Sequence, residues 1–221
     1  MMSAMSPRPA GAPPATGAGS RRKRSKGDLT SQAILDTAEH LLQTRSLDDI
    51  AVDELTSGAG ISRSTFYFHY ESREAVLYAL SERAAEGLYD SAALWLRRGS
   101  EPPEDSIRRA IAGTVALWRA HGPVLRAAVR ARDTSELVRG FWSGVARRFV
   151  DSTAQQIEIE REAGIAVPGP PTAHALATVL VTMNESMCYS LSLSRRSAAR
   201  DREAVETLTA VWLRSVYGVS R

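Results

Sequence analysis

Apolar residues recur every three or four positions along nearly the whole chain after residue 27, and this spacing limits the possible folds more than any other feature. Such spacing gathers apolar side chains on one face of an α-helix, whereas a half-buried strand alternates apolar and polar residues. No run of four residues alternates clearly. We therefore predict an all-α protein of about nine helices, at residues 30–43, 52–57, 62–69, 72–98, 105–120, 123–132, 134–162, 172–194 and 201–217.

Positive charge is concentrated at the start of the chain. Residues 1–27 hold six Arg and Lys side chains and no acidic one, which leaves a net charge of −3 for the rest. This segment is rich in Ala, Gly, Pro and Ser, so it cannot bury enough apolar surface to fold alone, and we expect a disordered basic arm. The arm either solubilises the protein or gains affinity from DNA phosphates through counterion release.

Three predicted helices lie within residues 28–75, and the last two are short. The turn between these two reads GAGIS and ends in Ser62, a favourable N-cap residue. Two short helices joined by a glycine-containing turn, with a third helix before them, match the helix-turn-helix unit, whose second short helix enters the major groove of DNA. We therefore predict a DNA-binding domain at 28–75, followed by a second helical domain at 76–221.

Five consecutive residues from Phe66 to Tyr70 carry rings, and they cannot all point inward from one short helix. Phe66 and Tyr70 are four positions apart and share a face, so we expect both to pack inward. The residues left to face outward are Arg63, Ser64, Tyr67 and His69.

The outward residues have the chemistry of a DNA-reading surface. Arg63 can make a bidentate contact to guanine, and the hydroxyls of Ser64, Thr65 and Tyr67 can donate to phosphate oxygens. Arg73 lies in the first turn of the next helix, where a cation gains nothing from the helix dipole, which suggests a phosphate contact. Pairing with Glu71 or Glu74 on a solvated face is the alternative for Arg73.

The predicted DNA-binding domain is itself acidic. Residues 28–75 hold three arginines and nine acidic residues, a balance of −6. Either the acidic groups lie away from the groove, or the basic arm supplies the missing attraction. On the second hypothesis, deletion of residues 1–26 weakens operator binding and flattens its salt dependence, and unchanged affinity and slope would reject it.

The stretch GISRSTFYFHYESREAVL resembles the TetR family of transcriptional repressors, whose motif reads loosely G-[IV]-S-x-x-T-[LF]-Y-x-[HY]-F-x-x-K-E-x-L. Tyr70 replaces the usual Phe and Arg73 the usual Lys, and both keep the physical role. The resemblance implies that Arg63, Ser64 and Tyr67 face bases. It also implies that the DNA backbone is held by Thr65, Tyr67, His69 and Arg73.

The stretches TAHALATVLVTMNESM and VWLRSVYG also resemble one member of that family. The resemblance implies a homodimer built on the last two helices and a long hydrophobic tunnel in each subunit for a small-molecule effector. Independently, two adjacent helices with wide apolar arcs exceed what the core of a monomer needs, which favours a dimer interface.

Candidate effector-binding residues come from aromatic and amide positions in the second domain. Trp142, Phe149 and Thr153 form one helical stripe, a pattern that is more often core than ligand site. Asn184 lies on an otherwise apolar stripe, and its amide could bond across a dimer seam, to Thr153, or to a ligand; the resemblance favours the ligand. Trp212 either closes the pocket or packs in the dimer. Ile107 and Thr114 enter through the resemblance, because they stand where the similar family member has aromatic residues in its fifth helix. The full candidate set is Ile107, Thr114, Trp118, Trp142, Phe149, Thr153, Met183, Asn184 and Trp212.

Several classes of protein are disfavoured. No apolar run is long enough to span a membrane and no signal-peptide core is present, so we expect a cytoplasmic protein. The single Cys188 lies in an apolar helical pattern and is expected to be a buried structural thiol. The four histidines lack metal-ligand spacing, and neither a Gly-rich phosphate loop nor a local Ser-His-Asp signature occurs, so we predict no enzyme, metal or cofactor.

Two other binding functions compete with a sequence-specific repressor. A nonspecific DNA-compacting protein would explain the basic arm but would leave the long apolar helices without a role. A small-molecule carrier would use the tunnel alone and leave the outward Arg63, Tyr67 and Arg73 without a purpose.

Overall fold

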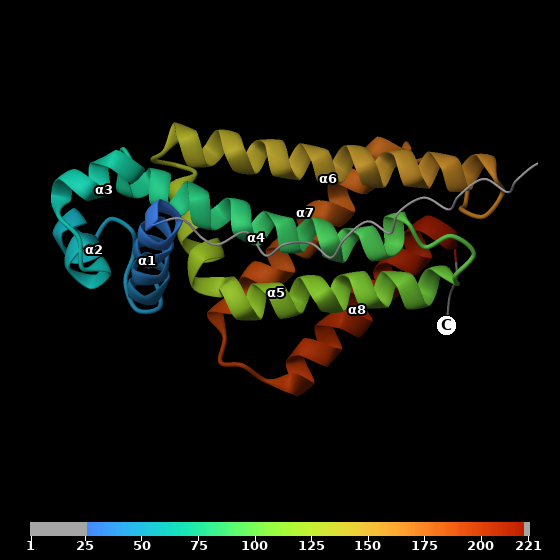
Figure 1. The fold of residues 1–221 in the computed structure, drawn as a ribbon. Coiled ribbons are helices and arrows are strands. Elements are labelled where there is room, and N and C mark those ends of the chain that lie inside the picture. The colour runs from blue at the N-terminus through green and yellow to red at the C-terminus, as the bar shows by residue number, and fades with distance from the viewer. Residues whose placement is uncertain (1–25, 219–221) are drawn as a thin grey trace, which may run out of the picture.

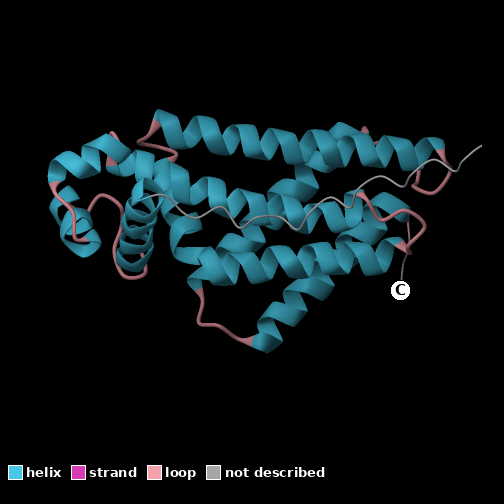
Figure 2. Cartoon of the chain, in the orientation of Figure 1, coloured by secondary structure: helices cyan, strands magenta, loops and turns pink. Residues whose placement is uncertain are grey.

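The computed structural model describes residues 26–218 and shows eight α-helices and no strand in that range (Figures 1 and 2). This confirms the all-α prediction, with one helix fewer than expected. The helices are α1 (Lys26–Leu41), α2 (Val52–Ala59), α3 (Arg63–His69), α4 (Arg73–Leu96), α5 (Pro103–Ala131), α6 (Glu136–Glu162), α7 (Ala173–Leu193) and α8 (Ala198–Tyr217). Except for Lys26 and Gly27, which belong to α1, the predicted basic arm lies outside the described residues.

The missing helix results from a merger within α5. The predicted helices at 105–120 and 123–132 form one element that bends at His121, whose backbone is non-helical (φ −109°, ψ 19°). Pro123 lacks an N–H and crowds the preceding turn, which accounts for a bend at this point. The helix then resumes because Val124 and Leu125 are both buried in the core.

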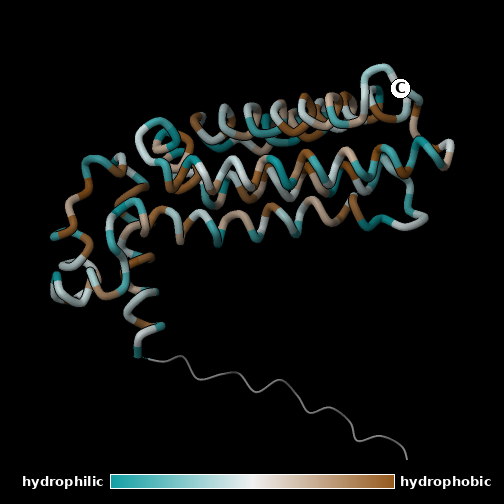
Figure 3. Tube along the Cα trace, turned by 90° about the horizontal axis from the view of Figure 1, so that it is seen from above, coloured by the Kyte–Doolittle hydropathy of each residue, from teal (hydrophilic) through white to brown (hydrophobic). Residues whose placement is uncertain are grey.

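The helices form a small group and a larger bundle that share α4 (Figure 1). α1, α2 and α3 lie together at one end, and α4 packs on α1 and runs from there into the bundle, where it packs against α5 and α6. α7 packs against α5 and α6, and α8 packs against α5. Hydrophobic positions recur along each long helix, as Figure 3 shows. One helix therefore contacts both parts of the molecule.

Fully buried side chains hold each part together. Ile34, Leu55 and Phe66 join α1, α2 and α3, while Ile157 and Leu180 are among those that join the bundle helices. Each such side chain contributes about 1.5–3 kcal/mol relative to an exposed one. The packing therefore follows the periodic apolar faces from which the helices were predicted.

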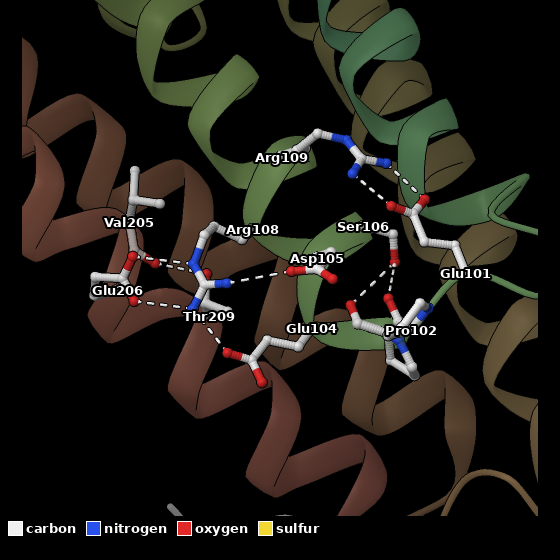
Figure 4. A network of polar contacts seen from close by, with 11 residues as sticks. Glu101, Pro102, Glu104, Asp105, Ser106, Arg108, Arg109, Val205, Glu206 and Thr209 are labelled. Carbon is white, nitrogen blue, oxygen red and sulfur yellow. Dashed lines mark hydrogen bonds and ion pairs between the residues drawn. The ribbon is translucent and has the colours of Figure 1, made fainter.

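Arginines fix the start of α5 (Figure 4). Arg108 donates to Glu104 in its own helix and, through Nε at 3.0 Å, to Glu206 in α8. Arg109 holds both carboxylate oxygens of Glu101 in the preceding loop. Exposed pairs of this kind contribute little stability singly, and of these contacts the Arg108–Glu206 pair joins α5 to α8.

Two further sequence expectations concern membranes and Cys188. Over the described range, no helix combines the length and the hydropathy that crossing a bilayer requires. The Cys188 thiol is free and buried, as predicted, and burial raises its pKa to about 12. Cys188 is therefore a core side chain that stays protonated at neutral pH.

Candidate functional site

The turn between α2 and α3 is fixed by two local features. Gly60 adopts the left-handed conformation (φ 66°), and its N–H reaches the carbonyl oxygens of Ser57 and Thr56. Only glycine adopts this conformation without strain. Ser62 then caps α3, because its Oγ accepts a hydrogen bond from the backbone N–H of Thr65 at 3.1 Å. The predicted helix-turn-helix geometry is therefore specified by residues within the turn.

The inner face of α3 is the one predicted from spacing. Phe66 is completely buried, and Tyr70 is partly buried with its hydroxyl 2.7 Å from the Ser31 Oγ of α1. Tyr70 thus keeps the ring of the usual Phe and adds a hydrogen bond to α1. These contacts orient α3 relative to α1.

The outer face of α3 carries the predicted residues and one that was missed. Arg63, Ser64 and Tyr67 are exposed, whereas Thr65 and His69 are partly buried. Phe68 was not predicted to face outward, yet it is 85% exposed, the most exposed of the large hydrophobic side chains. Phe68 lies two positions after the buried Phe66, which in a helix of 3.6 residues per turn is the opposite face, so the same spacing argument could have identified it.

Arg63 is held against the neighbouring helix by a weak contact. Its Nη1 lies 3.2 Å from Oδ1 of Asp53 in α2, and both side chains are more than half exposed. The Tyr67 hydroxyl first, and the Asp53 carboxylate second, raise the pKa of the Arg63 guanidinium. An exposed ion pair of this kind contributes little free energy in water, so Arg63 can exchange Asp53 for another acceptor.

Arg73 has a structural partner set that the sequence did not indicate. Its Nη1 donates to the backbone carbonyls of Leu47, Asp48 and Ile50 at 3.1, 3.0 and 2.8 Å. Its Nη2 lies 3.8 Å from Glu74, the pairing considered as an alternative. Arg73 therefore ties the loop before α2 to the first turn of α4.

A cavity of about 130 Å³ lies inside the larger bundle. It is lined by α4, α5, α6, α7 and α8 together with Arg132, which follows α5. Eight of the nine predicted residues line it: Ile107, Thr114, Trp118, Trp142, Phe149, Thr153, Asn184 and Trp212. The structure thus brings together side chains that are more than a hundred positions apart in the sequence.

Met183 is the exception and does not line the cavity. Its neighbour Asn184 does, together with Val181 and Glu185. Met183 lies two positions after Val181, which puts its side chain nearly on the opposite face of α7. Met183 instead packs against the hydrophobic core as a partly buried side chain.

Helix α4 contributes a wall of the cavity that was not predicted. The residues are Leu88, Ala92, Trp95 and Leu96. Their apolar pattern is indistinguishable from that of an ordinary core face, so no signal in the sequence assigns them to a cavity. Arg132 and Glu185 also line the cavity without having been predicted.

Asn184 has a partner other than those considered from the sequence. Its Oδ1 accepts a hydrogen bond from Nε1 of Trp212 at 3.1 Å. Trp212 in turn meets Trp95 edge to face, with ring centroids 5.3 Å apart. Asn184 and Trp212 are therefore positioned together at the cavity wall.

A buried polar network lies beside Trp95. The Glu160 carboxylate accepts from Arg98 at 2.8 Å, from Gln156 at 2.8 Å and from the Tyr217 hydroxyl at 2.5 Å. Trp95 donates to the same hydroxyl at 3.0 Å. Burial first, and the Glu160 carboxylate second, raise the pKa of Tyr217, which stays a neutral donor. The network joins the C-terminal end of α4 to α6 and α8.

Comparisons with known proteins agree with this geometry. Residues 34–80 match the family model "Bacterial regulatory proteins, tetR family", and residues 107–218 match "Transcriptional regulator EthR, C-terminal domain". The HTH-type transcriptional regulator EthR of Mycobacterium tuberculosis is 38% identical over 214 residues, which cover 92% of this chain and 94% of that protein. EthR of Mycolicibacterium smegmatis is 37% identical over 203 residues, with coverages of 90% and 92%.

Solved structures share the fold at lower identity. The reduced form of E. coli NemR superposes with a TM-score of 0.65 at 21% identity, covering 85% of this chain and 97% of that one. A putative regulator from Saccharomonospora viridis in complex with choline gives 0.66 at 18% identity, covering 86% and 98%. Taken with the two family matches and the identity to EthR over nearly the whole chain, the helix-turn-helix and cavity show that this chain belongs to the TetR family of DNA-binding transcriptional regulators, with a C-terminal domain of the EthR type.

Proposed function

We propose that this protein is a repressor that binds operator DNA as a homodimer and is released from it by a hydrophobic small molecule. The observation that carries the proposal is the placement of α4. Its first turn is tied by Arg73 to the loop before α2, and further along it lines the cavity through Leu88, Ala92 and Trp95. A change at the cavity can therefore move the DNA-reading helix.

In this proposal α3 enters the major groove. Arg63, Ser64 and Tyr67 face bases, and Phe68 supplies an apolar surface of the kind that meets a thymine methyl group. Thr65 and His69 face the DNA backbone. Arg73 supports this surface by fixing the loop before α2, and a DNA phosphate would compete with Glu74 for its Nη2 group.

We further propose that α7 and α8 form the dimer interface, with residues 28–75 reading DNA and 76–221 binding effector and partner. α7 exposes Val179 and Leu193, apolar side chains that a second subunit would cover. An effector that fits better when the two α4 helices are spread apart would shift the population toward that state and separate the α3 helices from their half-sites.

Replacement of Arg63 tests the DNA-reading part. We expect wild-type protein to give a discrete palindromic footprint upstream of its own gene. Arg63→Ala should weaken binding by about 1–3 kcal/mol, the value of one bidentate base contact, and relax specificity at one position per half-site. Gel shift and footprinting at fixed salt concentration measure both effects.

Arg147→Ala is the matched control, because Arg147 is an exposed arginine on α6, far along the chain from the reading helix. It removes the same charge and should leave the footprint unchanged. Diffuse protection that survives Arg63→Ala would contradict the proposal and favour the nonspecific DNA-compacting protein.

A further inference from the structure

A polar cleft of about 220 Å³ lies between the small group of helices and the bundle. One wall is formed by residues 42–48, in the loop before α2, and the other by α5 from Pro123 to Ala131. Thr134, in the connection between α5 and α6, completes the lining. The cleft shares no lining residue with the cavity inside the bundle, so it is a separate space.

Two arginines of α5 line the polar cleft without a carboxylate partner. Arg126 and Arg130 are four positions apart and are therefore neighbours on one face of the helix. Within residues 26–218 neither forms an ion pair, and Nη1 of Arg126 donates to a backbone carbonyl, that of Ser192 in α7, at 2.9 Å. Burial first, and the Arg130 charge second, lower the pKa of Arg126. Two like charges thus lie close together with no counter-charge bound to either.

The other charged side chains of the polar cleft do not supply that counter-charge. Arg45 pairs with Glu54 of α2, its Nη2 lying 3.0 Å from Oε2. Among the described residues that line the cleft, Asp48 is the single acidic one, and it forms no ion pair with Arg126 or Arg130. The cleft therefore keeps an excess of positive charge, which favours an anionic ligand.

The available donors suit a phosphate group. A guanidinium presents its N–H groups in a planar fork that matches two oxygens of a phosphate. The hydroxyls of Thr44 and Thr134 and the amide of Gln43 also line the cleft and can donate to further oxygens. One water needs only about 10–15 Å³ of such space, so the cleft has room for a phosphate and a small organic group attached to it.

The polar cleft lies where the small group of helices meets the bundle. The loop that forms one wall is the loop whose Leu47 and Asp48 carbonyls are held by Arg73 of α4. The opposite wall belongs to α5, which packs within the bundle. A ligand in the cleft would therefore contact both parts of the molecule.

We propose that the polar cleft is a second ligand site, which binds a small phosphate-bearing molecule through Arg126 and Arg130 and joins the loop before α2 to α5. A free molecule is favoured over a phosphate of bound DNA, because none of the α3 residues proposed to contact DNA lines the cleft. The site is independent of the proposed effector cavity.

Inorganic phosphate is the probe, titrated calorimetrically into the full-length protein without DNA at an ionic strength held constant with chloride. We expect saturable binding with a dissociation constant on the order of 1 mM, and at least about tenfold weaker binding by Arg126→Gln and by Arg130→Gln, since each removes a charge-assisted contact. Arg130 has no hydrogen bond or ion pair within residues 26–218, so its replacement should leave the fold intact.

Arg147→Gln is the matched control, because it removes an exposed arginine of α6 that does not line the cleft. It should bind phosphate as the wild type does. Hydrogen exchange locates the ligand: phosphate should slow exchange of the amides of residues 42–48 in the wild type and not in Arg130→Gln.

The contrary outcomes are distinct. Phosphate binding that Arg130→Gln leaves unchanged would place the anion on other basic groups and overturn the inference. Absence of saturable binding by the wild type, with a weaker and less salt-dependent operator complex in Arg126→Gln and Arg130→Gln, would assign both arginines to the DNA backbone and also overturn it. Because phosphate binding is measured without DNA, failure to find an operator would contradict the proposed function and leave this inference standing.

Discussion

Glu160→Ala is expected to lower the free energy of unfolding by about 3–5 kcal/mol, which is the usual cost of removing one of the two charged side chains of a buried ion pair. The Glu160 and Arg98 side chains are 3% and 7% exposed, so the substitution leaves a cation without a counter-charge in a site that water barely reaches. It also removes the acceptor of the Tyr217 hydroxyl. Urea denaturation followed by circular dichroism at fixed protein concentration measures the loss.

Glu158→Ala serves as the control on the same helix. Glu158 is exposed, and its removal should change stability by no more than about 0.5 kcal/mol. The double replacement Arg98→Met/Glu160→Leu removes both charges together and should recover part of the loss, because no unpaired buried charge remains although the Tyr217 hydroxyl still lacks its acceptor. A loss below about 1 kcal/mol for Glu160→Ala would show that the network is not a source of stability.

Filling the cavity is expected to reproduce the action of the effector. Thr114 lines the cavity from α5 and is only partly buried, so Thr114→Trp places a large ring in the space proposed for the ligand. If occupancy biases α4 away from the DNA-binding arrangement, operator affinity should fall by about 1–3 kcal/mol, the usual size of a coupling between two sites. Gel shift on the operator measures the loss.

Thr114→Val is the control, since it removes the hydroxyl without filling the cavity. Overpacking can itself destabilise a core by about 1–3 kcal/mol, so thermal unfolding must show that Thr114→Trp is folded at the assay temperature. Thr114→Phe provides a smaller filling group if it is not. Wild-type operator affinity in a folded, filled variant would contradict the proposed coupling between cavity and DNA-reading helix.

Helix α3 could be predicted well because its determinants are local. Ser62 directly precedes the helix and accepts a hydrogen bond from the backbone N–H three positions later. The spacing of Phe66 and Tyr70 identifies the inner face without knowledge of any other element. Spacing within α6 likewise placed Trp142, Phe149 and Thr153 on the face that lines the cavity. The misplacement of Met183 in α7 and the omission of Phe68 in α3 came from incomplete use of the helical period.

Contacts between distant residues could not be predicted in this way. Asn184 was recognised as an amide in need of a partner, but the partner is Trp212, on the next helix. Arg73 bonds to carbonyls more than twenty positions earlier, and Arg98 pairs with Glu160 of α6. Helical periodicity determines which residues share a face of one helix, and therefore the sequence by itself determined the helices, the cap of α3 and its buried side. Which face meets which depends on how whole helices pack, and only the tertiary structure decided the cavity, the residues that line it and the place of α4 beside both the cavity and the loop before α2.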